Sequence, residues 1–167
     1  MRWQWLVMCA AVLATPAAAK EVDGRIGFGA EGSPRGGTAV HTTYWISQQV
    51  GIQGALGLAI RSSSGFGSSA VAVFGVSGLY NLVEHDTINL TAQLSVGLAA
   101  GDASVIRLSP GLRPELFLSD DFSLHTSLGL AVVLGDGSGV LGSNIDGTAI
   151  SVGPAGLTGG VGFTFYR

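Results

Sequence analysis

The stretch TINLTAQLSVGLAA, Thr87 to Ala100, alternates apolar with polar or small side chains almost without error. Its apolar positions are Ile88, Leu90, Ala92, Leu94, Val96 and Leu98, and the positions between them are Asn89, Thr91, Gln93, Ser95 and Gly97. Because successive side chains of a strand point to opposite faces, this pattern predicts a β-strand with one apolar and one polar face. In a soluble sandwich the apolar face points inward, whereas in a membrane barrel lipid covers the apolar face and the polar face lines the interior.

Similar segments follow one another along the chain, and none of its windows has a convincing helical period. The eight expected strands are Val22 to Glu31, Thr38 to Gln48, Val50 to Arg61, Ala70 to Leu82, Thr87 to Ala100, Val105 to Leu118, Phe122 to Leu134 and Thr148 to Tyr166. In the fourth segment, which begins apolar on both sides, we favour Phe74, Val76, Tyr80 and Leu82 as one face. Pro110, Pro114 and Pro154 predict a bulge or a shifted register in their strands, because proline has no N–H to donate to a ladder.

The connections between these segments consist of turn-forming residues. Short connections at Gln48 to Gln49, Glu84 to Asp86 and Ser119 to Asp121 alternate with broadly longer ones at Ser33 to Gly37, Ser62 to Ser69, Gly101 to Ser104 and Gly135 to Gly147. Every second connection of an up-and-down barrel emerges at the same rim, so this alternation predicts one rim with longer loops, as in outer-membrane barrels. Segments of about ten residues or more also match the ~9 to 11 residues that a tilted strand needs to cross a bilayer.

The first 19 residues have the pattern of a secretory signal peptide. Arg2 supplies the positive start, Trp5 to Thr15 the apolar run, and Ala17 to Ala19 the small-residue cleavage site. A retained anchor is the alternative, but the run has roughly half the ~20 apolar residues of a spanning helix. We therefore expect residues 1–19 to be removed and residues 20–167 to form one β-barrel domain, without a disulfide because Cys9 is the chain's one cysteine.

The composition favours a barrel that is polar inside. Charged residues make up 11% of the chain, against about 25% in a typical soluble protein. If the apolar faces pointed inward, the exterior would consist largely of glycine and alanine and would lack the charge that keeps exposed sheets apart. Small and polar side chains suit the narrow interior of eight strands, and lipid accepts the apolar side. The sequence therefore predicts an all-β fold, an eight-stranded antiparallel up-and-down transmembrane β-barrel.

Several charged residues fall on the expected interior face, namely Arg25, Arg61, Arg107, Arg113, Glu31 and Glu115. Charges in a narrow interior must be paired, so we expect a polar network formed by Arg25, Arg107, Arg113 and Glu115. One hypothesis is that this network fills and stiffens the barrel, and the other is that it forms a constriction for small solutes. We favour the first, because eight strands leave little open lumen.

The whole of residues 20–167 resembles the small eight-stranded bacterial outer-membrane barrels of the OmpX and OmpA type. The most specific part is the tail, Gly160-Val161-Gly162-Phe163-Thr164-Phe165-Tyr166-Arg167. It resembles the C-terminal signal of such barrels, although the family usually ends on the aromatic residue itself. The resemblance implies that Gly160, Phe163, Phe165 and Tyr166 are recognised by the barrel-assembly machinery. It also implies Sec export, periplasmic chaperones and a monomer in contact with lipid and lipopolysaccharide in the outer membrane of a Gram-negative bacterium.

The catalytic option rests on His125-Thr126-Ser127, which resembles the His-x-Ser of the lipid A 3-O-deacylases. In that family the histidine activates the serine and a later glutamate orients the histidine. This chain has Leu128 and Gly139 where the family has asparagine and that glutamate. We therefore expect no catalytic residues and no enzymatic activity.

Other ligand classes find no support in the residue spacing. His41 and His85 stand alone, without a second ligand at metal spacing, so we expect no metal site. No helix follows a glycine-rich loop, and no basic stretch exists, so we expect neither a cofactor nor nucleic acid as a partner. We expect an integral outer-membrane protein with a structural or loop-mediated role. A narrow porin-like channel and a soluble secreted β-barrel that binds an apolar ligand are the alternatives.

Overall fold

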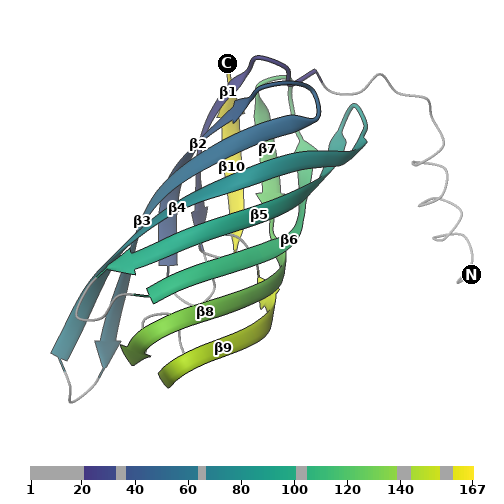
Figure 1. The fold of residues 1–167 in the computed structure, drawn as a ribbon. Coiled ribbons are helices and arrows are strands. Elements are labelled where there is room, and N and C mark those ends of the chain that lie inside the picture. Colours follow the sequence, from purple (N-terminus) through teal and green to yellow (C-terminus); the bar gives the residue numbers. More distant parts are fainter. Residues whose placement is uncertain (1–20, 33–36, 64–66, 101–104, 139–143, 155–159) are drawn as a thin grey trace, which may run out of the picture.

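The computed structural model describes residues 21–32, 37–63, 67–100, 105–138, 144–154 and 160–167 (Figure 1). Its strands are β1 (Ile26–Gly32), β2 (Gly37–Trp45), β3 (Val50–Ser63), β4 (Gly67–Glu84), β5 (Ile88–Ala100), β6 (Val105–Phe117), β7 (Phe122–Thr126), β8 (Leu128–Ser138), β9 (Asn144–Pro154) and β10 (Val161–Tyr166). In these ranges, no helix is long and apolar enough to span a membrane. The expected signal peptide, residues 1–19, lies outside the described residues.

The sheet closes on itself through the first and last strands. Each strand from β1 to β6 pairs antiparallel with the next, and β10 joins β7 to β1. β7 and β8 are two halves of one strand along β6, and β9 and β10 are two halves of the strand beside it. The predicted eight-stranded antiparallel up-and-down barrel is therefore confirmed. We call the β1–β10 pairing, from Gly27↔Tyr166 to Gly32↔Val161, the closing seam.

The prolines of β6 interrupt one ladder without shifting its register. β5 pairs with β6 continuously from Ile88↔Leu116 to Ala99↔Val105. On the other side, the pairs of β6 with β7 and β8 skip positions 109–110 and 113–114, although the register on either side of each gap is the same. Pro110 and Pro114 lie at these gaps because they lack an N–H for the ladder. The expected bulge in this strand is therefore absent, and a bulge lies instead between β4 and β5, at Leu82.

Several strands extend further than expected at the rim opposite the short turns. β3 and β4 are 14 and 18 residues long and pair as far as Ser63↔Gly67, so most of the expected loop Ser62 to Ser69 is strand. β8 and β9 likewise pair as far as Ser138↔Asn144. The prediction of long loops is wrong for these two connections, because glycine and serine here continue the ladder. Most of the expected loop Ser33 to Gly37, and all of Gly101 to Ser104, lie outside the described residues.

The two faces of the barrel wall differ in the predicted way. In β5, Ser95 is 2% exposed, whereas its neighbours Leu94 and Val96 are 53% and 46% exposed. The face favoured for the fourth segment, with Phe74, Val76, Tyr80 and Leu82, also points outward. Among the strand positions whose side chains are described, none of those that face outward is charged. The apolar face is therefore the exterior of the barrel.

The lumen is layered along the barrel. At the rim with the short turns it is filled by an apolar layer of Val22, Trp45, Leu79, Phe117 and Tyr166. Toward the opposite rim lies a second apolar layer of the small residues Ala39, Val73, Ala99 and Val105. Buried polar side chains occupy the rest of the lumen, and some of them, such as Asn81 and Asn89, lie beside the short turns. They form the candidate site.

Candidate functional site

Strands from all round the barrel contribute polar side chains that are at most 5% exposed. We call this set the lumen cluster. Its members are Glu31, His41, Thr43, Gln53, Ser77, Asn81, Asn89, Thr91, Gln93, Ser95, Ser109, Arg113, Glu115, Ser123, His125, Ser127 and Thr164. They lie on the polar face of each strand, because every second residue points inward.

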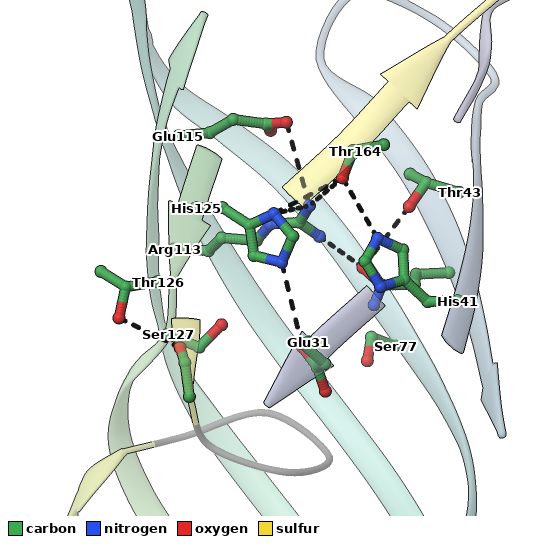
Figure 2. A network of polar contacts seen from close by, with 12 residues as sticks. Glu31, His41, Thr43, Ser77, Arg113, Glu115, His125, Thr126, Ser127 and Thr164 are labelled. Carbon is green, nitrogen blue, oxygen red and sulfur yellow. Dashed lines mark hydrogen bonds and ion pairs between the residues drawn. The ribbon is translucent and has the colours of Figure 1, made fainter. Parts of the chain in front are cut away.

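Arg113, from β6, is the centre of the lumen cluster (Figure 2). Its Nη1 donates a hydrogen bond to Gln53 Oε1 on β3. Its Nη2 lies 3.2 Å from Nδ1 of His125 and 3.4 Å from Oγ1 of Thr164. The guanidinium group thus joins side chains of β3, β7 and β10, and its planar set of donors suits several acceptors at once.

Glu115 supplies the negative charge beside Arg113. The two groups are 3.9 Å apart, and their side chains are 1% and 2% exposed, respectively. Ser123 Oγ donates a hydrogen bond to Glu115 Oε1, as does the Tyr166 hydroxyl at 2.7 Å. A buried charge is tolerated when it is both paired and hydrogen-bonded, and Glu115 is both. Through Tyr166, the ion pair is also tied to the apolar layer at the short-turn rim.

The β4–β5 wall carries uncharged polar groups that bond to one another. Gln93 Nε2 donates to Ser77 Oγ at 3.2 Å and to Ser95 Oγ at 3.0 Å, and Ser127 Oγ donates to Gln93 Oε1 at 3.1 Å. Thr91 Oγ1 donates to Asn81 Oδ1 at 2.7 Å. These hydroxyl and amide groups therefore bond to one another, whereas Asn89 Nδ2 on the same wall has no partner among the described residues. The ionisable members lie nearer the closing seam.

The structure separates the four residues expected in one interior network. Arg113 and Glu115 are together, and Arg107 is a half-buried lumen residue whose Nε donates to Ser109 Oγ at 2.9 Å. Arg25 lies at the short-turn rim, where it pairs with Asp121, donates to the Asp120 carbonyl at 2.7 Å and stacks over the Tyr166 ring at 5.5 Å. Arg25 precedes β1, so it reaches the acidic β6–β7 turn rather than the middle of the lumen.

His41 and His125 lie close together, so treating His41 as isolated was wrong. Their ring centroids are 5.2 Å apart, and both residues are 4% exposed. β1 and β10 separate their strands in the sheet, and the register places Gly29 opposite His41 and Gly162 opposite His125. A Cβ at Gly29 would lie 2.6 Å from His41 Nε2, and one at Gly162 would lie 2.5 Å from His125 Nε2. These two glycines therefore provide the space that the imidazole rings occupy.

Glu31 lies beside His41 and His125 at the closing seam, and the three residues form one group. Its Oε2 lies 4.0 Å from His125 Nε2, and the residue is 5% exposed. Gly162 lies between Glu31 and His125 in the sheet, since it pairs with both. Spacing in the sequence gave no signal for this group, because its members meet only when the barrel closes.

The residues that resemble the deacylase pair have separate partners. His125 contacts Arg113 and Thr164, whereas Ser127 donates to Gln93. Both side chains are buried and face the lumen. A lipid substrate would approach from outside the barrel, so catalysis would need a path through the wall. His85 lies away from them in the β4–β5 turn, where its backbone N–H donates a hydrogen bond to Asn89 Oδ1 at 3.4 Å.

The residues of the expected assembly signal divide between the two faces. Phe163 and Phe165 point outward and cluster with Phe122, whose ring centroid is 4.7 Å from that of Phe165. Tyr166 points inward and is 4% exposed. The Gly160 carbonyl accepts hydrogen bonds from Ser127 N–H at 3.3 Å and from Thr126 Oγ1 at 3.1 Å.

Comparison of the chain with protein-family models, curated proteins and solved structures finds no match. The resemblance to the OmpX and OmpA type of barrel therefore stays a prediction from the sequence.

Replacing Arg113 by methionine should lower the free energy of unfolding by about 3 to 5 kcal/mol, because Glu115 would be left as an unpaired buried charge. Arg25→Met, at the rim where the Asp121 side chain is 71% exposed, should cost less than about 1 kcal/mol. Urea titration of protein refolded in detergent micelles measures both. Adding Glu115→Gln to Arg113→Met should recover part of the loss. Equal effects of the two arginine variants would contradict the central role of Arg113.

Proposed function

We propose that this chain is an integral outer-membrane β-barrel protein with a structural or loop-mediated surface role. The observation that carries the proposal is the reversed distribution of side chains, with large apolar groups outside and a buried polar cluster inside. Each large apolar side chain left in water forgoes about 1.5 to 3 kcal/mol of burial free energy. A lipid environment removes this penalty, and a closed sheet satisfies the backbone hydrogen bonds that lipid cannot.

Aromatic residues near the short-turn rim support the same proposal. Tyr44, Tyr80 and Phe165 point outward there and are 42%, 51% and 55% exposed. Transmembrane barrels carry rings of aromatic side chains at the height of the lipid headgroups. This rim would then face the periplasm, because it holds the short turns and the C-terminal strand end.

The structure of the lumen argues against both alternatives in the described part of the chain. An open channel needs a water-filled path, whereas here two apolar layers and buried polar side chains occupy the lumen, and Arg113 reaches across to Gln53 on β3. A soluble carrier of an apolar ligand needs an apolar cavity inside. One apolar depression, of about 890 Å³, is lined mainly by outward-facing side chains such as Val40, Leu56, Phe74 and Val96.

Biogenesis completes the proposal. Export by Sec and passage with periplasmic chaperones would precede insertion, with Gly160, Phe163, Phe165 and Tyr166 as the signal for the barrel-assembly machinery. The outward aromatic pair Phe163 and Phe165 is available for such recognition on the strand that closes the barrel. Membrane lipid and lipopolysaccharide would then cover the apolar exterior of a monomer.

Fractionation tests the location directly. The chain expressed in a Gram-negative host should sediment with the outer membrane, and its mobility on a gel should change after heating. Both results are expected because a closed barrel resists mild detergent until it is heated. Recovery of folded protein in the soluble periplasm would overturn the proposal.

A substitution of Leu94 tests which face meets lipid. Leu94→Arg, in the middle of β5, should lower the free energy of unfolding in lipid vesicles by about 2 to 4 kcal/mol. Leu118→Arg, on the short turn after β6, should cost about 0 to 1 kcal/mol, since it lies at the proposed interface. Equally small effects at both positions would mean that Leu94 does not face the hydrocarbon core.

Planar bilayers distinguish a filled barrel from a narrow pore. Purified protein should insert without steady current steps, because the two apolar layers and the lumen cluster block the path for ions. Protein denatured by heating serves as the control for leakage. A reproducible unitary conductance that the denatured protein lacks would support the channel alternative instead.

A further inference from the structure

We propose that Glu31, His41 and His125 form a binding site for a divalent transition-metal ion, with zinc as the reference ion, inside the barrel wall at the closing seam. Each residue offers one ligand atom, and these atoms all lie within 4.8 Å of one another. The proposal goes beyond the proposed function and does not depend on it, because the site is built from lumen residues whichever solvent surrounds the barrel.

The donor set suits such an ion. Two imidazole nitrogens and one carboxylate oxygen are common ligands of zinc, and three protein ligands leave a fourth position for water. All three residues are at most 5% exposed, so a bound ion would be shielded from competing water. Calcium and magnesium prefer oxygen ligands alone, so a set with two imidazoles disfavours them.

Each imidazole has one nitrogen engaged and one without a hydrogen-bond partner. His41 Nε2 lies 3.1 Å from Thr164 Oγ1, and His125 Nδ1 lies 3.2 Å from Arg113 Nη2 and 3.4 Å from Thr164 Oγ1. The remaining nitrogens, His41 Nδ1 and His125 Nε2, are buried without a partner among the described residues. A buried polar atom without a partner is costly, so two in one cluster point to a ligand that both can bind.

Glu31 and His125 lie close together without a hydrogen bond between them. Glu31 Oε2 and His125 Nε2 are 4.0 Å apart, beyond hydrogen-bond distance, and the residue between them in the sheet is Gly162. Bonds of about 2.0 to 2.2 Å to a tetrahedral zinc ion would place two ligand atoms roughly 3.4 Å apart. Ligand atoms that are now 4.0 to 4.8 Å apart would therefore need to approach by about 0.6 to 1.4 Å. Rotation of the two imidazole rings, which lie over Gly29 and Gly162, would bring them closer.

The neighbouring groups can hold the imidazoles in place for the ion. If His125 binds the metal through Nε2, its proton moves to Nδ1, where Thr164 Oγ1 can accept a hydrogen bond. Arg113 Nη2, 3.2 Å from Nδ1, would then have to turn away, because both groups would be donors. Arg113 is a positive charge beside the site, but it is paired with Glu115 and bonded to Gln53. The carboxylate of Glu31 supplies a negative charge that attracts a divalent cation and partly neutralises it.

The location gives the metal a structural role. Glu31 lies on β1, His41 on β2 and His125 on β7, so a shared ion would span the closing seam and the intervening strand β10. Because the unfolded chain lacks this arrangement, the ion would bind the folded barrel preferentially and raise its stability.

The test uses the full barrel domain without a histidine tag, refolded in detergent with zinc chloride or with EDTA. After gel filtration, the wild-type protein should retain about one zinc per chain by elemental analysis, and its thermal unfolding midpoint should be higher than with EDTA. His41→Gln and His125→Gln should each lower the zinc affinity at least about 10-fold, and Glu31→Gln should weaken it as well. His85→Gln, which also removes one histidine, should bind zinc as the wild type does.

A second measurement covers variants that fail to fold. Cobalt(II) refolded into wild-type protein should give visible absorption bands of a four-coordinate site with nitrogen and oxygen ligands. Zinc absent from refolded wild-type protein, or unchanged binding by a folded His125→Gln barrel, would overturn the proposal. Loss of binding in His85→Gln alone would do so too, because the ion would then lie elsewhere.

Discussion

The structure depends on the pairing of β1 with β10, which closes the sheet. Gly27 and Tyr166 are partners although 139 positions separate them in the chain. Closing so long a segment costs roughly 4 kcal/mol of chain entropy in a simple loop model. Once closed, the sheet has a narrow lumen, and every second side chain must fit into it. The glycines at positions 29 and 162 and the many serines and threonines of the inner face follow from that lack of space.

Closure also decides which charges the interior tolerates. Arg113 and Glu115 are almost fully buried, and each has several hydrogen-bond partners in addition to the other's charge. An isolated charge at either position would be strongly unfavourable, whereas the hydrogen-bonded pair links β3, β6, β7 and β10. Arg25 differs because it lies at the rim, where water and the acidic turn Asp120 to Asp121 are within reach.

The fold could be predicted from local information, as could the placement of Arg113 and Glu115 together in the lumen, but the other lumen contacts could not. The alternation in Thr87 to Ala100 depends on neighbouring residues alone, so it revealed the strand and its two faces, and the same was true of the other segments. The ends of β3, β4, β8 and β9 were missed because glycine and serine are typical of turns, yet here they continue a ladder whose partner strand holds them. Pro110 and Pro114 were recognised as irregular, but the sequence did not indicate that the gaps fall on one side of β6.

The contact between His41 and His125 shows the limit of spacing arguments most clearly. Their strands are neither adjacent in the sequence nor direct partners in the sheet. The two imidazole rings can come close because Gly29 and Gly162, on the strands between them, have no side chains in the way. The ionisable members of the lumen cluster come from β1, β2, β6 and β7, while the β4–β5 wall carries amides and hydroxyls. Ionic and imidazole contacts are therefore concentrated around the seam, where strands most distant in sequence meet. Interactions placed there offset the entropy of the longest closure in the chain, whereas the hairpin β4–β5 forms locally and needs no such support.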